Sequence, residues 1–148
     1  MSYHDLVIVP HLEIRGANAL SSPYTIGFPA VTAWLGASHH WQRQLRDNGQ
    51  TKLVISGTGV VCHAFSLHTD SRTSKYADMI VGTGNPLTKE GKRPPFVPQA
   101  SCSIDCTMAL ELEHFDPDDE NAILTQLHSI ALKGRVAGGD VLAMGRPR

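Results

Sequence analysis

The stretch IDCTMALELEHF, residues 104–115, decides the fold class, because its apolar and polar residues alternate over the whole length. This is the pattern of a strand with one buried face and one exposed face. The parity expected to face the core consists of Ile104, Cys106, Met108, Leu110 and Leu112, and the outward parity includes Asp105, Thr107, Glu111 and Glu113. The sequence therefore predicts a long strand with a core on one side only.

A helix and a short strand are predicted directly after it. Asp116 is placed to cap the helix, Pro117 suits its first position, and residues 118–120 bring carboxylates to the positive end of its dipole. The expected buried stripe is Ile123, Leu127, Ile130 and Ala131, and Lys133-Gly134 ends the helix. The turn 135–140 then leads into a short apolar strand at residues 141–144.

The chain begins with a similar strand and helix. Residues 5–15 predict a strand with Leu6, Ile8, Leu12 and Ile14 toward the core, and Pro10 indicates an edge position or a bulge. Residues 30–47 predict an amphipathic helix that follows Pro29 and ends before Asn48-Gly49. Its expected apolar stripe is Val31, Trp34, Leu35, Trp41 and Leu45. Residues 52–67 predict one bent strand, or two short strands separated by a glycine turn.

This order of elements predicts an α+β fold. Strand, helix, one or two strands, strand, helix and strand match a ferredoxin-like, RRM-type antiparallel sheet with two helices on one face. The region rich in Gly, Pro, Ser, Thr and Lys predicts an inserted arm at about residues 69–103, because a structureless loop of that length is unusual in a compact domain. Residues 1–148 are expected to form a single domain.

Composition restricts the class of protein and its location. With 148 residues, 41% apolar content and a net charge of -1, the chain can bury a core, and it has no apolar run long enough to span a membrane. Three cysteines are a small and odd number, which argues against a disulfide framework. The lack of such a framework favours the reducing cytoplasm as the location. Cys102 and Cys106 would lie about 13 Å apart on a strand, too far to share a zinc ion, so neither a metal nor a cofactor is expected.

The polar turn after the first strand has chemistry that suits phosphate and base recognition. The segment Arg15–Leu35 passes from a strand through a polar turn into a helix, and it offers hydroxyls, an amide and free backbone N–H groups. The arm and the region after Lys133 are locally basic, whereas residues 111–120 carry six carboxylates. Because Glu111 and Glu113 would repel phosphate on the sheet, glycine-rich loops and basic arms are the expected contacts if RNA binds, while the charge pattern alone equally fits an ordinary surface.

Four blocks of the sequence resemble a known family in collinear order. They are MSYHDLVIVPHLEIRGANALSSPYTIGFPAVTAWLG, GTGVVCHAF, IVGTGNPLTKEGKRPPFVPQA and AGGDVLAMGRP. They resemble the type I-F CRISPR subunit that caps the 5′ end of the guide RNA in the Csy complex, a Cas-five-type member of the RAMP superfamily. Members usually run to roughly twice this length, so the resemblance covers the first RRM-like domain.

The resemblance implies a non-catalytic, RNA-binding scaffold subunit of an antiviral surveillance complex. Its implied partners are the 5′ handle of the guide RNA, the large subunit and the backbone subunit, with target DNA reached only through the complex and no membrane. The implied RNA contacts are Arg15, Asn18, Ser21, Ser22 and Thr25 in the first loop, Lys89, Lys92 and Arg93 in the arm, and Arg135, Gly138, Gly139 and Arg146 near the C-terminus. The first loop and the glycine-rich turn are expected at the same end of the sheet.

Three other functions fit the residues. A ferredoxin-like RNA endonuclease would use histidine as acid or base, with His11 as the best candidate among eight histidines. A protein-only interaction module could mimic the subunit and block assembly. A small-molecule-binding domain of the same fold would bind neither RNA nor the large subunit.

Overall fold

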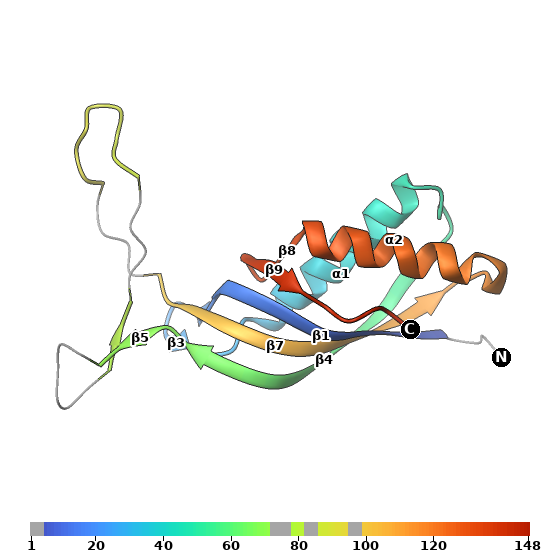
Figure 1. Ribbon diagram of the computed structural model, residues 1–148, viewed down its shortest axis with the longest axis horizontal. Helices are drawn as coiled ribbons and strands as arrows, with labels where there is room; N and C mark the ends of the chain where they lie inside the picture. The colour runs from blue at the N-terminus through green and yellow to red at the C-terminus, as the bar shows by residue number, and fades with distance from the viewer. Residues whose placement is uncertain (1–4, 72–77, 82–85, 95–98) are drawn as a thin grey trace.

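The computed structural model describes residues 5–71, 78–81, 86–94 and 99–148, and its centre is a five-stranded antiparallel sheet (Figure 1). The strands lie in the order β4-β7-β1-β9-β8. They are β1 (Asp5–Asn18), β4 (Val54–Leu67), β7 (Ser101–Glu113), β8 (Arg135–Val136) and β9 (Gly139–Ala143). Two small hairpins pair β2 (Leu20–Ser22) with β3 (Thr25–Ile26), and β5 (Thr69–Asp70) with β6 (Met79–Ile80).

Helices α1 (Val31–Asp47) and α2 (Glu120–Lys133) cover the same face of the sheet and leave the other face open (Figure 1). Strand β7 alternates between buried and half-buried residues without a break, as predicted, and its buried residues face the core between the sheet and the helices. From the helices come the buried side chains Trp34, Trp41, Leu45, Ile123 and Leu127. The prediction of an α+β fold with two helices is confirmed.

The residues of β1 that face the core change from odd-numbered to even-numbered positions half way along the strand. Val7 and Val9 are buried before the change, and Leu12 and Ile14 after it, because the register with β7 shifts between Val9 and Leu12. His11 adopts a φ of 46° within this bulge. The prediction of a bulge at Pro10 is correct, but the prediction that Leu6 and Ile8 face the core is wrong, and Leu6 is 61% exposed.

The other elements match their predictions with smaller differences. Residues 54–67 form one continuous strand rather than two. The predicted ends of α1 are correct, yet Val31 and Leu35 of the expected stripe are exposed, and Ala37 and Ser38 are buried instead. Asp116 caps a 3₁₀ turn, Pro117–Asp119, that precedes α2, and its carboxylate accepts from the Asp118 N–H at 3.1 Å.

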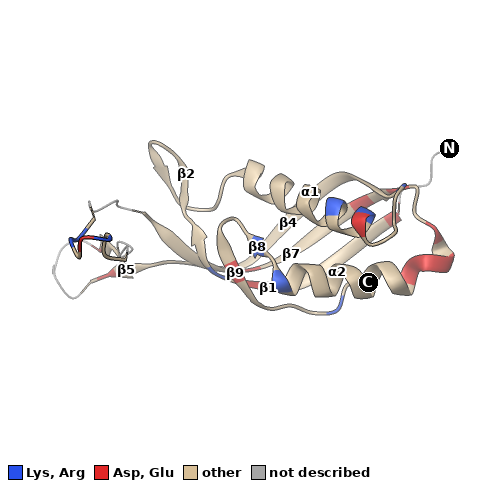
Figure 2. Cartoon of the chain, turned by 90° about the horizontal axis from the view of Figure 1, so that it is seen from above, with Lys and Arg blue, Asp and Glu red and all other residues tan. Residues whose placement is uncertain are grey.

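The predicted arm contains the β5–β6 hairpin and a turn at residues 88–92, and it ends earlier than expected because β7 starts at Ser101. The GTGN and PFVP parts of the arm lie outside the described residues. Figure 2 shows that the basic segment 86–94 and the carboxylates around the start of α2 lie at opposite ends of the molecule. Among the described residues, none of the helices combines the length and apolar character that a membrane crossing requires.

Candidate nucleic-acid interface

Three segments that are far apart in the sequence enclose an open groove of about 520 Å³ on the helix-covered side of the sheet. One wall consists of Asn18 at the end of β1 and Leu20 at the start of β2. The second is the β8–β9 turn, with Arg135 and Gly138, and the third is the first half of α1, including Thr32 and Ala33. The groove joins three of the predicted RNA contacts, Asn18, Arg135 and Gly138.

The β8–β9 turn is fixed against the end of β1. The Asn18 N–H donates to the Ala137 carbonyl at 2.8 Å, and both Ala137 and Gly138 have positive φ, as the tightest hairpin turns require. A Cβ atom on Gly138 would lie 3.9 Å from the Cβ of Asn18. The two loops expected at one end of the sheet are therefore side by side.

Gly139 has a packing role in this arrangement. A Cβ atom there would lie 2.7 Å from the Ala17 nitrogen and 2.8 Å from the Arg15 carbonyl, so a side chain has no room. Gly139 is buried, whereas Gly138 is exposed on the groove. Gly139 thus holds β9 close to β1 and is not available on the surface for a ligand.

The start of α1 gives the groove a positive pole. The N-cap residue Ala30 supplies no side-chain acceptor, and the first turn contains no acidic residue. The Ala33 N–H donates to the Ala30 carbonyl at 2.9 Å, and the N–H groups ahead of it carry the positive end of the helix dipole, which favours an anion. Thr32 is exposed in this turn, and the Arg135 guanidinium adds a full positive charge from the facing wall.

The groove contains an amide that can donate to a base and a guanidinium that can pair with phosphate. The Asn18 side-chain oxygen accepts from the Leu20 N–H at 3.0 Å, which leaves its amide nitrogen to donate to a ligand. Arg135 Nε donates to Asp140 Oδ1 at 2.9 Å, and both side chains are well exposed. An incoming phosphate therefore competes with one solvent-screened carboxylate for Arg135.

The hydroxyl residues of the first loop are bonded to one another. Ser22 Oγ donates to Thr25 Oγ1 at 2.9 Å, and Ser21 Oγ donates to the Thr25 carbonyl at 3.2 Å. The Tyr24 N–H donates to Ser22 Oγ at 3.3 Å. Ser21, Ser22 and Thr25, which were expected to face RNA, thus stabilise the β2–β3 hairpin.

The remaining predicted contacts lie away from the groove. Arg15 is on the open face of the sheet, in a shallow hollow of about 280 Å³ shared with Glu13 and Asp105. Arg146 lies beside α2, in a hollow with Asn121 and His128. Lys89, Lys92 and Arg93 are exposed on the arm. The structure therefore brings together Asn18, Arg135 and Gly138, and separates them from the other cations.

Among the groove residues that the sequence did not single out are Thr32, Gly36, His40 and Gln99. The first three recur at four-residue steps, which places them on one face of a helix. That spacing, together with a helix start that has neither a cap nor a carboxylate, was the available signal. Gln99 carried none, because it belongs to the arm.

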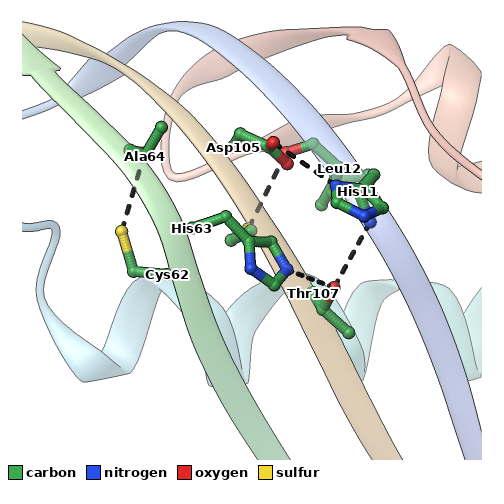
Figure 3. A network of polar contacts seen from close by, with 8 residues as sticks. His11, Leu12, Cys62, His63, Ala64, Asp105 and Thr107 are labelled. Carbon is green, nitrogen blue, oxygen red and sulfur yellow. Dashed lines mark hydrogen bonds and ion pairs between the residues drawn. The ribbon is translucent and has the colours of Figure 1, made fainter.

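The open face carries a network of two histidines (Figure 3). The rings of His11 and His63 stack with centroids 4.8 Å apart, and each residue bonds to Thr107, His11 through its backbone N–H at 3.3 Å and His63 through Nε2 at 2.7 Å. His11 Nδ1 lies 3.4 Å from Asp105 Oδ2. Both histidines sit at bulges, where β1 and β4 shift register against β7. The bulges thus aim both rings at β7.

The three cysteines are free thiols in different surroundings. Cys102 and Cys106 are buried and Cys62 is exposed. Burial, with a smaller effect from nearby Cys62, raises the pKa of Cys102 to about 11 and that of Cys106 to about 12. Among the described residues, no group of three His, Cys, Asp or Glu side chains is arranged to hold a metal ion.

Thiol alkylation should therefore distinguish the cysteines. At pH 8, a thiol with a pKa of about 12 is ionised in roughly one molecule in ten thousand, and only the thiolate reacts. We expect iodoacetamide to modify Cys62 of the folded protein rapidly, and Cys102 and Cys106 only after denaturation. Mass spectrometry of the alkylated peptides measures this, and Cys62→Ser should abolish the fast phase. Rapid labelling of Cys106 would contradict its position in the core.

Comparisons with known proteins assign the chain to a family. The family model described as CRISPR-associated protein (Cas_Csy2) matches residues 7–148. CRISPR-associated protein Csy2 of Pseudomonas aeruginosa (strain UCBPP-PA14) is 32% identical over 139 residues, which make up 93% of this chain and 42% of that protein. The chain thus spans less than half the length of this relative. It belongs to the Csy2 family of CRISPR-associated proteins, the type I-F subunits that its sequence blocks resemble.

Proposed function

We propose that the chain is a non-catalytic, RNA-binding subunit of a type I-F CRISPR surveillance complex in antiviral defence, and that its groove binds the 5′ handle of the guide RNA. In the complex it contacts the large subunit and the backbone subunit, and it meets target DNA only through them. Membership of the Csy2 family supports a role in a Csy complex. The RNA contact rests on the groove.

We also infer that the domain is ferredoxin-like. Counted along the chain with the two-residue strand β8 set aside, β1, β4, β7 and β9 lie in the order 2-3-1-4, with all neighbours antiparallel. The two helices make the two crossover connections on one face. This arrangement and the inserted arm support the RRM-like reading of the sequence.

The observation that carries the proposal is the meeting of an uncapped helix start, an arginine and an amide in one groove. A phosphate suits the first N–H groups of α1, and the Arg135 guanidinium can pair with a second phosphate or the same one. Asn18 can donate to a base edge or a sugar. These groups satisfy a nucleotide chain better than a small uncharged ligand.

Single substitutions of two arginines test the path of the RNA. A handle RNA held in the groove passes Arg135 and not Arg15, which lies on the opposite face. We expect Arg135→Ala to weaken binding by about tenfold and to lower the slope of log K against log salt by about 1. Arg15→Ala should change both by much less. Fluorescence anisotropy over a salt series measures these values.

Asp140→Asn provides the matched control. It removes the carboxylate that holds Arg135 Nε and should tighten RNA binding, because the guanidinium is released and one negative charge is lost. Equal binding by the wild type, Arg135→Ala and Asp140→Asn would contradict binding in the groove. Binding that depends on Arg15 alone would move the site to the open face.

The arm and Arg146 are proposed as outer contacts. Lys89, Lys92 and Arg93 are exposed cations on a turn held by the Thr88 N–H to Lys92 carbonyl bond of 2.9 Å. Since they are distant from the groove, they suit phosphates further along the guide RNA or the adjacent backbone subunit. Arg146 has a similar outer position beside α2.

The histidine network does not favour an endonuclease. General acid–base cleavage requires groups on either side of a bound phosphate, but the His11 and His63 rings are stacked on each other. Asp105 and Glu13 also lie on that face, where their charges disfavour a phosphate chain. Retention of intact handle RNA after prolonged incubation is the expected result.

A further inference from the structure

We propose that Tyr24, at the tip of the β2–β3 hairpin, is a base-stacking residue for the single-stranded RNA in the groove. This inference rests on the proposed function and adds a contact that neither the sequence pattern nor the family match assigns. Tyr24 is 97% exposed, more than any other large apolar or aromatic side chain among the described residues. An aromatic ring on a fixed support is what a nucleobase needs for stacking.

The hairpin is built to hold this ring in place. Ser22 Oγ accepts from the Tyr24 N–H and donates to Thr25 Oγ1, so the residues on both sides of the tip are joined. At the base of the hairpin, the Gly27 N–H donates to the Ala19 carbonyl at 2.8 Å, and the Ala19 N–H donates to the Ala100 carbonyl at 3.0 Å. The hydroxyls are therefore occupied, and the tyrosine ring is the group left to meet a ligand.

The position of the hairpin connects it to the groove. Leu20 opens the hairpin and also lines the groove beside Asn18. Figure 2 shows the hairpin standing out from the body next to the start of α1. An RNA strand that leaves the groove past Asn18 thus reaches the hairpin first.

The chemistry of the hairpin favours a base over a phosphate. Residues 19–28 contain no charged side chain, so they offer no partner for the backbone of RNA. A tyrosine loses little side-chain entropy on binding and stacks on any base. The groove would then hold the sugar-phosphate chain, and Tyr24 would hold a base at its exit.

Substitutions at Tyr24 test the proposal with handle RNA as the probe. We expect Tyr24→Ala and Tyr24→Leu to weaken binding at least about fivefold, while Tyr24→Phe binds like the wild type, because a ring and not its hydroxyl or apolar area is required. The salt slope should stay unchanged in all three variants, since no phosphate contact is lost. Circular dichroism confirms that each variant is folded.

A series of handle RNAs with one abasic nucleotide each gives the decisive comparison. At the position that stacks on Tyr24, loss of the base should make wild type and Tyr24→Ala bind equally, whereas at other positions the difference should persist. Equal binding of intact RNA by both proteins would overturn the inference. So would a Tyr24→Ala defect seen only in co-purification with the large subunit, which would make the ring a protein contact.

The outcomes separate this inference from the proposed function. If the wild type binds RNA and Arg135→Ala weakens it while Tyr24→Ala does not, the stacking contact is wrong and the groove stands. If the wild type does not bind handle RNA, both the stacking contact at Tyr24 and the proposed RNA-binding function are wrong.

Discussion

Replacing Trp41 with alanine is expected to lower the free energy of unfolding by about 3–5 kcal/mol. Trp41 is 0% exposed in the middle of α1, and its indole lies close to Gly134 at the end of α2. Its removal leaves a cavity where the two helices meet over the sheet. Urea denaturation followed by circular dichroism measures the change.

Trp41→Phe is the matched control for this prediction. The Trp41 Nε1 atom is buried without a hydrogen-bond partner, so phenylalanine removes a poorly satisfied polar group while it retains most of the ring volume. We expect it to cost less than about 1.5 kcal/mol. A small effect of Trp41→Ala, similar to that of Trp41→Phe, would show that α1 does not pack on the sheet as described.

Local pattern predicted the parts of the fold in which the period is uninterrupted. Strand β7 lies between β4 and β1 and alternates between buried and half-buried residues over its full length. The extra residues of the bulges belong to β1 and β4, so β7 itself has no bulge. In β1 the same reasoning failed for Leu6 and Ile8, since the bulge at Pro10-His11 reverses the buried face. Sequence indicated the bulge but could not give its consequence, because a shift of one residue exchanges the two faces.

The sequence predicted only some of the residues that meet in the groove. Asn18 and Gly138 could be placed together, because the ends of adjacent strands meet at one end of a sheet. Arg15 precedes the bulge at Gly16 and lines a separate hollow with Glu13 and Asp105, although Arg15 and Asn18 lie opposite Ser103 and Ser101, two residues on one face of β7. The serines of the first loop form local hydrogen bonds, since hydroxyls in a turn bond each other as readily as a ligand, and their contact with RNA stays a prediction.

The second large effect is expected from two carboxylates at the start of α1. Thr32 and Ala33 lie in the first turn of the helix and line the groove. In Thr32→Glu/Ala33→Glu, the new charges face the positive end of the dipole, so the melting temperature should rise by about 1–3 °C. The same charges should repel RNA phosphates from the groove and weaken handle binding by at least about tenfold.

The opposite signs of these two effects make the variant informative. Most substitutions that abolish binding also destabilise the protein, and loss of fold then explains loss of function. Here the protein becomes more stable as it loses RNA. Thr32→Gln/Ala33→Gln has side chains of nearly the same size without charge, and it should bind RNA within about threefold of the wild type.

The affinity of the Glu/Glu and Gln/Gln variants for handle RNA, measured by anisotropy in one buffer beside their melting temperatures, tests the central claim most directly. We predict that the Glu/Glu protein melts higher and binds at least about tenfold more weakly than the Gln/Gln protein, and that added salt narrows the difference in affinity. Equal affinities of the two variants, with both folded, would show that RNA does not enter the groove at the start of α1.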